Sequence, residues 1–325
     1  MPAIDLRPVT LEQLDELCAL TNRVEQFEGI PRVLMVDELR QDLEAPHVDV
    51  SVDTRAAYID DELAGWAWIW NPPSEVSQER AYVNGEVDPA HRGQGVGRAL
   101  LAWGMSRAAE RLRSRGHDLP RYVRVDAYDF LEANHHLYAR MGFEPVRWFE
   151  ELGRPLAPLP AVVVPEGVEL VPWSLERNEE FRLVHNEAFA DHWGSTPTGP
   201  EDWHDATVGH GARPDLSMVA IEQSTGRAVA ICLNHAYPED DELTGRREAW
   251  IDSLATLREW RGRGVASALI ARSLAVFAAE GFTHAMLGVD SDNPSGAARL
   301  YRSLGFERER RSITHQIEVV PSARF

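Results

Sequence analysis

The sequence is poor in cysteine and in long apolar runs, and each shortage excludes a class of protein. The two cysteines, Cys18 and Cys232, form no C-x-x-C pair and have no metal-ligand spacing. We therefore expect two small buried thiols, no metal site and a reducing cytoplasm. No stretch approaches the roughly 18 apolar residues of a membrane span. The start, MPAIDLRPVT, has no basic segment followed by an apolar one, so we expect no secretory signal and no membrane partner.

Basic charge is also scarce. The chain has 33 basic and 52 acidic residues, a net charge of −19. Nucleic acid is thereby disfavoured as a partner, because phosphate contacts need a basic face. An acidic chain suits a cationic acceptor such as an amine, although the charge can also serve solubility alone. With 325 residues, the length suggests two domains.

The chain repeats itself once, over a whole domain. Three segments of the first half recur in the same order in the second half, at offsets that differ only by loop-sized amounts. The matched pairs are DLRPVTLE (5–12) with ELVPWSLE (169–176), RGQGVG (92–97) with RGRGVA (261–266), and LYARMGF (137–143) with LYRSLGF (300–306). This order indicates duplication of one fold and not a short solenoid repeat.

A proline-rich stretch separates the two copies. Residues 153–167 read GRPLAPLPAVVVPEG, with four prolines, and such a segment is extended and semi-rigid. We expect a first domain over residues 1–152, a linker over 153–166 and a second domain over 167–325.

Each copy alternates strands and helices in the same order. The pattern predicts a strand, a helix, a hairpin, and then a strand (81–87 or 249–256) that leads into a glycine-rich loop and a long helix. A further strand, a short helix and one or two final strands follow. The expected fold class is α/β, with a mixed central sheet covered by helices on both faces.

The glycine-rich loop is suited to binding an anion. A loop that leads into a helix presents backbone N–H groups, and the helix start adds roughly half a positive charge. Glycines allow close approach of a phosphate. The spacing matches neither the dinucleotide fingerprint nor a nucleotide P-loop. The predicted cofactor-binding residues of the two loops are Arg92, Gly93, Gln94, Gly95, Val96, Gly97 and Arg98, and Arg261, Gly262, Arg263, Gly264, Val265, Ala266 and Ser267.

The combination resembles the GNAT superfamily of N-acetyltransferases. Its loop signature, Arg/Gln-x-x-Gly-x-Gly/Ala, is met in both copies, and the segment from Asp292 to Phe306 resembles the later signature. The resemblance covers nearly the whole chain apart from the linker. It is strongest to two-domain actinobacterial members.

The resemblance implies a cofactor and a place for it. Acetyl-CoA is expected in a cleft where two central strands splay apart, with its pyrophosphate on the loop. Its pantetheine is expected along the preceding strand, which is Gly85, Glu86 and Val87 in the first copy and Leu254, Ala255 and Thr256 in the second. A backbone N–H there would bind the thioester oxygen.

The resemblance also implies catalytic residues. Tyr301 occupies the position of the acid that protonates the leaving thiolate, and Asn293 the position of a cofactor-binding asparagine. Asp252 or Glu248 could accept the amine proton, or either could make only a structural bond. The first copy has Phe130 in place of the asparagine. The second copy is therefore predicted to be catalytic, and the first to be weakened, structural or a second cofactor site.

The acceptor is predicted only as a class. Glu187 and Asp191, one helical turn apart, could hold a cation. The leading expectation is a small-molecule primary amine, acetylated by a monomer or homodimer. Three alternatives stay open: a cysteinyl pseudo-disaccharide as acceptor, a protein lysine as acceptor, and a non-catalytic acyl-CoA-binding sensor.

Overall fold

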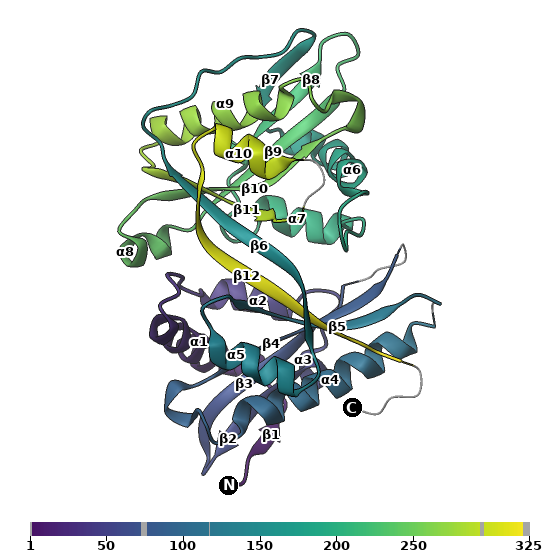
Figure 1. Ribbon diagram of the computed structural model, residues 1–325, viewed down its shortest axis with the longest axis vertical. Helices are drawn as coiled ribbons and strands as arrows, with labels where there is room; N and C mark the ends of the chain where they lie inside the picture. Colours follow the sequence, from purple (N-terminus) through teal and green to yellow (C-terminus); the bar gives the residue numbers. More distant parts are fainter. Residues whose placement is uncertain (1, 73–76, 117, 293–295, 321–325) are drawn as a thin grey trace. The chain divides into compact units, whose positions relative to one another are not determined.

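The computed structural model describes residues 2–72, 77–116, 118–292 and 296–320. The chain divides into two compact units (Figure 1). The first comprises the chain up to Arg147 together with the segment from Ser312 onward, and the second comprises Trp148–Arg311. The two units share one fold, as the sequence repeat predicts.

The first unit is a sheet in the order β1-β2-β3-β4-β5-β12, in which β4 and β5 run parallel and the other neighbouring strands described run antiparallel. Its elements are β1 (Asp5–Arg7), α1 (Leu14–Glu28), α2 (Val36–Leu43), α3 (Val50–Asp53), β2 (Thr54–Ile59), β3 (Glu62–Trp70), β4 (Glu79–Val87), α4 (Val96–Ser114), β5 (Arg121–Tyr128), α5 (Glu132–Arg140), the start of β6 (Glu144–Pro155) and the end of β12 (Glu307–Glu318).

The second unit repeats this arrangement in the order β6-β11-β10-β9-β8-β7, with β10 and β11 parallel. Its remaining elements are β7 (Val168–Pro172), α6 (Asn178–Phe189), α7 (Pro200–Val208), β8 (Met218–Glu222), β9 (Ala228–Ala236), α8 (Asp241–Thr244), β10 (Glu248–Thr256), α9 (Val265–Ala279), β11 (His284–Asp290) and α10 (Ala297–Ser303).

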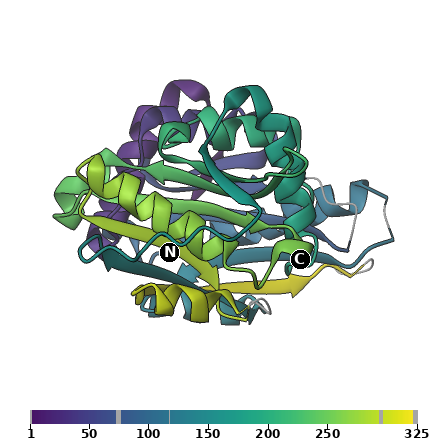
Figure 2. The same cartoon turned by 90° about the horizontal axis from the view of Figure 1, so that it is seen from above.

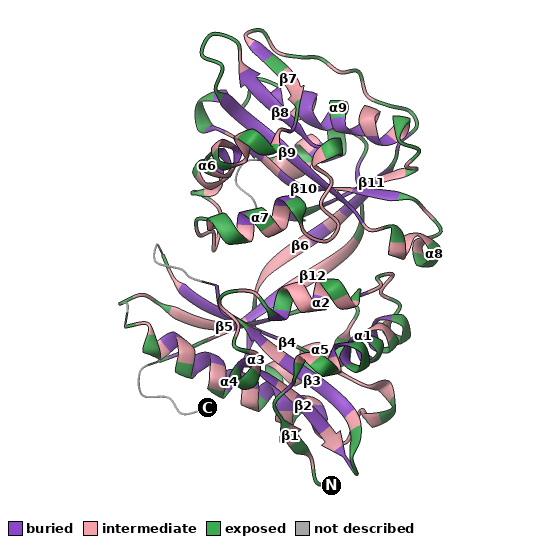
Figure 3. Cartoon of the chain, turned by 180° about the vertical axis from the view of Figure 1, so that it is seen from behind, coloured by how far each residue is buried: buried purple, intermediate pink, exposed green. Residues whose placement is uncertain are grey.

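Helices cover both faces of each sheet, which explains why a central strand such as β9 can be buried on both of its faces. Every residue of β9 is buried. Cys232 on β9 accepts a hydrogen bond from Ser273 of α9, whereas Ser253 on the opposite face of the sheet meets His185 of α6. Figure 2 shows α6 and α9 on opposite sides of the strands, and Figure 3 shows these strands as buried.

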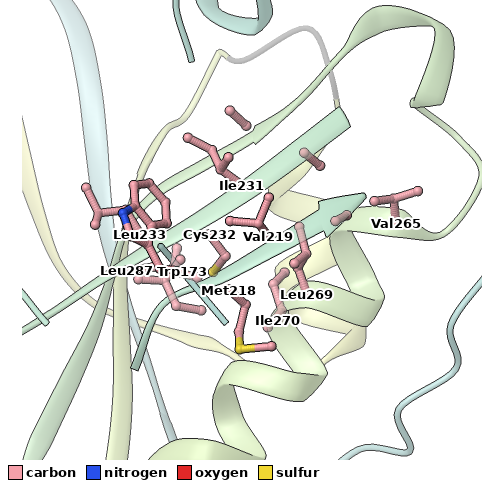
Figure 4. Close-up of a cluster of buried hydrophobic side chains, with 14 of the residues drawn as sticks. Trp173, Met218, Val219, Ile231, Cys232, Leu233, Val265, Leu269, Ile270 and Leu287 are labelled. Carbon is pink, nitrogen blue, oxygen red and sulfur yellow. The ribbon is translucent and has the colours of Figure 1, made fainter. Parts of the chain in front are cut away.

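The core of the second unit is an apolar cluster formed by the sheet together with α6, α7 and α9, and Figure 4 shows part of it. Ile231, Val219, Leu269 and Ile270 are among its fully buried side chains. In the first unit, Trp66 of β3 packs towards α1 and donates a hydrogen bond to Thr21, while α4 packs against the adjacent Gly65 on the other face. Burial of these side chains fixes which strand faces which helix.

The last strands of the two copies are exchanged, and this differs from the contiguous domains expected at 1–152 and 167–325. By sequence, β12 ends the second copy, yet Ser312–Glu318 pairs with β5 of the first unit. Conversely, β6 ends the first copy, yet Phe149–Pro155 pairs with β11 of the second unit. The first three residues of the expected linker, Gly153–Pro155, therefore belong to a paired strand.

Candidate active site

The parallel pair of strands opens into a wedge in both units. β4 pairs with β5 only over Glu79–Tyr82, although β4 continues to Val87. β10 pairs with β11 only over Glu248–Ile251, although it continues to Thr256. Beyond these points, the backbone N–H and C=O groups of β4 on the side of β5, and of β10 on the side of β11, no longer pair with the neighbouring strand. They face the opening instead. The splay expected from the sequence resemblance is thus present twice.

Each opened strand ends in the glycine-rich loop, with matching local geometry. A 3₁₀ turn, Pro89–His91 or Arg258–Trp260, precedes the loop. Gly93 and Gly95 have φ of 76° and 95°, and Gly262 and Gly264 have φ of 72° and 86°. Gly95 and Gly264 are the N-caps of α4 and α9. The first N–H groups of each long helix therefore have no intrahelical acceptor and are directed at the loop, as an anion site requires.

The loop arginine makes matching protein contacts in the two copies. Arg92 donates to the Val87 carbonyl and forms an ion pair with Glu28 of α1 at 2.5 Å. Arg261 donates to the Thr256 carbonyl at 3.1 Å and to the Ala188 carbonyl at 2.6 Å. Both guanidinium groups tie the loop to the strand end and to the helix beside it. These contacts position the loop, and the expected role of the two arginines as cofactor ligands stays a prediction.

The first unit contains a cavity of about 970 Å³ at its wedge. Its wall includes the end of β4, the loop, the first turn of α4, the end of β5 and α5. Of the predicted cofactor-binding residues of this copy, the cavity is lined by Gly85, Glu86, Val87, Arg92, Gly93, Gly95, Val96, Gly97 and Arg98. The structure therefore brings nearly all of the first copy's predicted residues to one site.

Glu86 is one of the acidic residues that line this cavity, although the sequence singled it out only for its backbone. Burial, reinforced by the charges of Glu28 and Glu25 and opposed by Arg92 and Arg32, raises the pKa of Glu86 to about 8. Within the described part of the chain, its carboxyl has no hydrogen-bond or ion-pair partner. A carboxyl with this pKa changes its protonation state near neutral pH.

The raised pKa predicts how stability depends on pH. The folded state holds the Glu86 proton more tightly than the unfolded state, so its stabilising effect is complete below the ordinary glutamate pKa and is lost as pH rises through about 8. We expect Glu86→Gln to leave the Tm unchanged at pH 5 and to raise it by about 3 °C at pH 9. Differential scanning calorimetry checks this, with exposed Glu44→Gln as the control. Equal Tm values for wild type and Glu86→Gln at pH 9 would contradict it.

Tyr138 lies on α5 across the same cavity. Its hydroxyl donates to the Asp126 carbonyl at 3.2 Å, and Asn134 provides a side-chain hydrogen bond. Burial raises the pKa of Tyr138, with a contribution from the charge of Glu86. The sequence signal for Asn134 was its place four residues before Tyr138, one helical turn away. Asn134 thus supplies a side-chain amide in the first copy. In that copy, Phe130 stands at the position where the resemblance leads us to expect an asparagine.

Tyr301 occupies the corresponding place in the second unit. Only 8% of its surface is exposed, its ring packs on Phe306, and within the described residues its hydroxyl has no hydrogen-bond partner. Burial, assisted by the nearby Cys232 thiol, raises the pKa of Tyr301 to about 12. The phenol therefore keeps its proton through the physiological range, as a proton donor must.

The structure separates the two carboxylates expected as alternative bases. Glu248 begins β10, eight residues before Thr256 and about 26 Å from it at strand rise. It is buried and forms an ion pair with Arg246 at 2.7 Å, so it does not reach the wedge. Asp252 is exposed at a bulge where pairing with β9 skips a residue. The bulge also breaks the expected alternation that would place Glu248 and Asp252 on one face.

Sequence reasoning missed His185, which faces the opened part of β10. Its Nδ1 lies 3.0 Å from the Ser253 hydroxyl, and its ring stacks on Phe189. Burial, with a smaller effect of His192, lowers the pKa of His185 to about 4. The ring is therefore neutral at physiological pH. The only sequence signal was its position in the repeat, because its role depends on a contact across 68 residues.

The expected cation site in the second unit is only partly assembled. Helix α6 ends at Phe189, so Asp191 lies beyond it and not one helical turn from Glu187. Asp191 is instead 3.8 Å from Arg261. Asn293 lies outside the described residues. Within those residues, no group of three or more potential metal ligands occurs, and no helix is long and apolar enough to cross a membrane.

Comparisons with known proteins identify both copies. The model described as "Acetyltransferase (GNAT) family" matches residues 178–306, and "Acetyltransferase (GNAT) domain" matches residues 53–145. A mycothiol acetyltransferase of Thermobispora bispora is 32% identical over 77% of this chain and 79% of its own. A mycothiol acetyltransferase of Kocuria rhizophila is 30% identical over 90% of this chain and 92% of its own.

Solved structures match over both units. A GCN5-related N-acetyltransferase from Sphaerobacter thermophilus has a TM-score of 0.74 and 25% identity, covering 99% of this chain and 98% of its own. A tandem GNAT protein from the clavulanic acid biosynthesis pathway has a TM-score of 0.72 and 20% identity, covering 99% of this chain and 100% of its own. The second likeness concerns the fold alone.

Proposed function

Because the chain belongs to the GNAT family of acetyltransferases, we propose that it acetylates a primary amine of a small molecule at the second unit. The chain is an acetyl-CoA-dependent N-acetyltransferase, and the proposal concerns the acceptor and the residues. The observation that carries it is the wedge beside β10, which ends in an anion-binding loop and has the buried Tyr301 phenol beside it.

Each part of this wedge has a chemical role. The N–H groups of Val265, Ala266 and Ser267 would hold the pyrophosphate of acetyl-CoA, which supplies the activated acetyl group. The open edge of β10 at Leu254–Thr256 would bind the pantetheine and the thioester oxygen. Tyr301 would donate its proton to the leaving sulfur. For the base, Asp252 is supported by its exposed position at the bulge, whereas Glu248 is not.

A cysteinyl pseudo-disaccharide is the second candidate acceptor. It is favoured by the similarity to a mycothiol acetyltransferase over 90% of this chain. The acceptor class can be found by measuring CoA release with polyamines, aminoglycosides and cysteinyl sugars. Proteins can be included in this assay as acceptors, and it stays clear which chain has been acetylated. The chain contains no lysine, so any acetyl-lysine formed comes from the acceptor.

The assignment to the second unit is tested by removing one hydroxyl. We expect Tyr301→Phe to lower kcat for the best acceptor about 100-fold, because the thiolate then leaves without a positioned acid. Tyr138→Phe is the matched control and should leave kcat for that acceptor unchanged. Full turnover in Tyr301→Phe, combined with its loss in Tyr138→Phe, would reverse the assignment. Absence of CoA release by the wild type with every amine would refute the proposed reaction.

A further inference from the structure

The proline-rich linker that precedes β7 reaches the anion-binding loop of the second unit. Pro165 stands three residues before β7, and its Cγ atom lies 3.8 Å from the point that a Cβ atom on Gly264 would occupy. Gly264 is the N-cap of α9, so this end of the linker lies against the backbone that would hold the pyrophosphate. In Figure 1 the linker is the loop that joins β6 to β7.

The first unit has the same arrangement at its own loop. Pro2 likewise stands three residues before β1, and it lines the cavity together with Gly93 and Gly95. The segment that leads into the first strand of each copy therefore borders the glycine-rich loop. In the second unit this segment is continuous with the linker, which brings additional side chains to the loop.

The linker is fixed to the second unit at its start as well as at the loop. The backbone N–H of Leu156 donates to the Thr283 carbonyl at 2.9 Å, and the buried Arg154 guanidinium donates to the Pro158 carbonyl. Between these contacts and the loop, residues 159–164 have no hydrogen bond to any other described residue. They are therefore held near the second unit and can still be covered by a ligand.

The end of this segment exposes apolar side chains next to the loop. Val163 is 73% exposed, the highest value of any large apolar side chain in the part of the chain that the structure describes, and Val164 is 40% exposed. Their Cα atoms lie at most about 7.6 Å from that of Pro165, because consecutive Cα atoms are about 3.8 Å apart. Adjacent uncovered apolar side chains beside a binding loop are typical of a surface that a ligand covers.

The chemistry of the linker suits a base and not a phosphate. Residues 156–167 contain no basic residue and one acidic residue, the exposed Glu166. Phosphate groups are better bound by the N–H groups of the loop and by the exposed Arg258 and Arg263 beside it. The adenosine of CoA is joined directly to the pyrophosphate, so it must lie near the loop. Its adenine ring is flat and uncharged, and it can pack on aliphatic side chains.

We propose that Val163 and Val164 form the adenine subsite of the second unit, where they pack against the base of bound acetyl-CoA. This inference rests on the proposed function, since it takes acetyl-CoA as the donor of this unit. It gives the linker a part in donor binding in addition to its part as a connection between the two copies.

The test compares donors with and without the adenosine in the full-length chain carrying Gly95→Val, which blocks the first loop. Titration calorimetry measures the Kd of acetyl-CoA and of S-acetyl-4′-phosphopantetheine, which lacks the adenosine. We expect the double variant Val163→Ser, Val164→Ser to raise the Kd of acetyl-CoA about 10-fold, because apolar contact with the base is lost. The Kd of S-acetyl-4′-phosphopantetheine should stay unchanged. Acetyl-dephospho-CoA should lose the same 10-fold, because the linker offers no basic group to the 3′-phosphate.

Two substitutions at other exposed apolar positions are the matched controls. Leu159→Ser lies in the same linker, six residues before Pro165, and Leu243→Ser lies on α8 of the same unit. Both should leave the three Kd values unchanged. In turnover that requires Tyr301, the double variant should raise the KM for acetyl-CoA and leave kcat unchanged, because the contact is far from the reacting atoms.

An unchanged Kd of acetyl-CoA in the double variant would overturn the inference. An equal rise in the Kd of S-acetyl-4′-phosphopantetheine would also overturn it, because the linker would then act on the loop and not on the base. Weakening that is seen with acetyl-CoA and absent with acetyl-dephospho-CoA would assign the contact to the 3′-phosphate instead. Absence of acetyl-CoA binding by the second unit before any change in the linker would refute the proposed function itself.

Discussion

A chain that stops after Arg311 is expected to lose the first unit and to keep the second. The removed segment contains Ser312–Glu318, whose seven residues pair with β5. It also contains Thr314, His315 and Val319, each at most 5% exposed. At roughly 1 kcal/mol per ladder hydrogen bond and about 2 kcal/mol per buried apolar side chain, the loss is comparable to the 5–15 kcal/mol stability of a typical domain.

Limited proteolysis followed by mass spectrometry measures this result. Cleavage should spread through residues 1–147 of the shortened chain, while 148–311 stays protected. A chain that stops after Val320 keeps the whole of β12 and is the matched control. If the first unit resists protease equally in both chains, β12 is not needed to complete its sheet and the exchange of strands has no energetic role.

Valine at the N-cap glycine of either long helix is expected to abolish acetyl-CoA binding in that unit alone. Gly95 and Gly264 have φ of 95° and 86°, a region that is strained for a β-branched residue. The strain is about 1–3 kcal/mol, and the added methyl groups would also lie over the N–H groups that hold the pyrophosphate. We expect the Kd of the altered unit to rise at least about 100-fold, which corresponds to about 2.7 kcal/mol.

Binding stoichiometry separates the two loops. Titration calorimetry should give two molecules of acetyl-CoA per wild-type chain, one for Gly95→Val, one for Gly264→Val and none for the double variant. Gly226→Val, at a hairpin turn of the second unit with φ of 72°, is a control for strain away from the loops. Two bound molecules in either single variant would show that the N-cap geometry is not required for the donor.

The sequence by itself determined the duplicated fold and the position of each loop. Local signals suffice for these features, because strand alternation, helix periodicity and glycines at positive φ act over a few residues. The expected strand 81–87 is β4 from Glu79 to Val87, and the expected strand 249–256 is β10 from Glu248 to Thr256. The turn at Asp60-Asp61 likewise has the positive φ that a tight hairpin needs.

Only the tertiary structure decided which strand completes which sheet and what each charged group contacts. β6 and β12 end two similar copies, so either could pair with β5 or with β11, and no local pattern distinguishes the choices. The ion pair of Arg92 with Glu28 and the raised pKa of the Glu86 carboxyl depend on α1, which lies far away in the sequence. Such contacts are set by packing between distant segments, because burial and charge act through space and not along the chain.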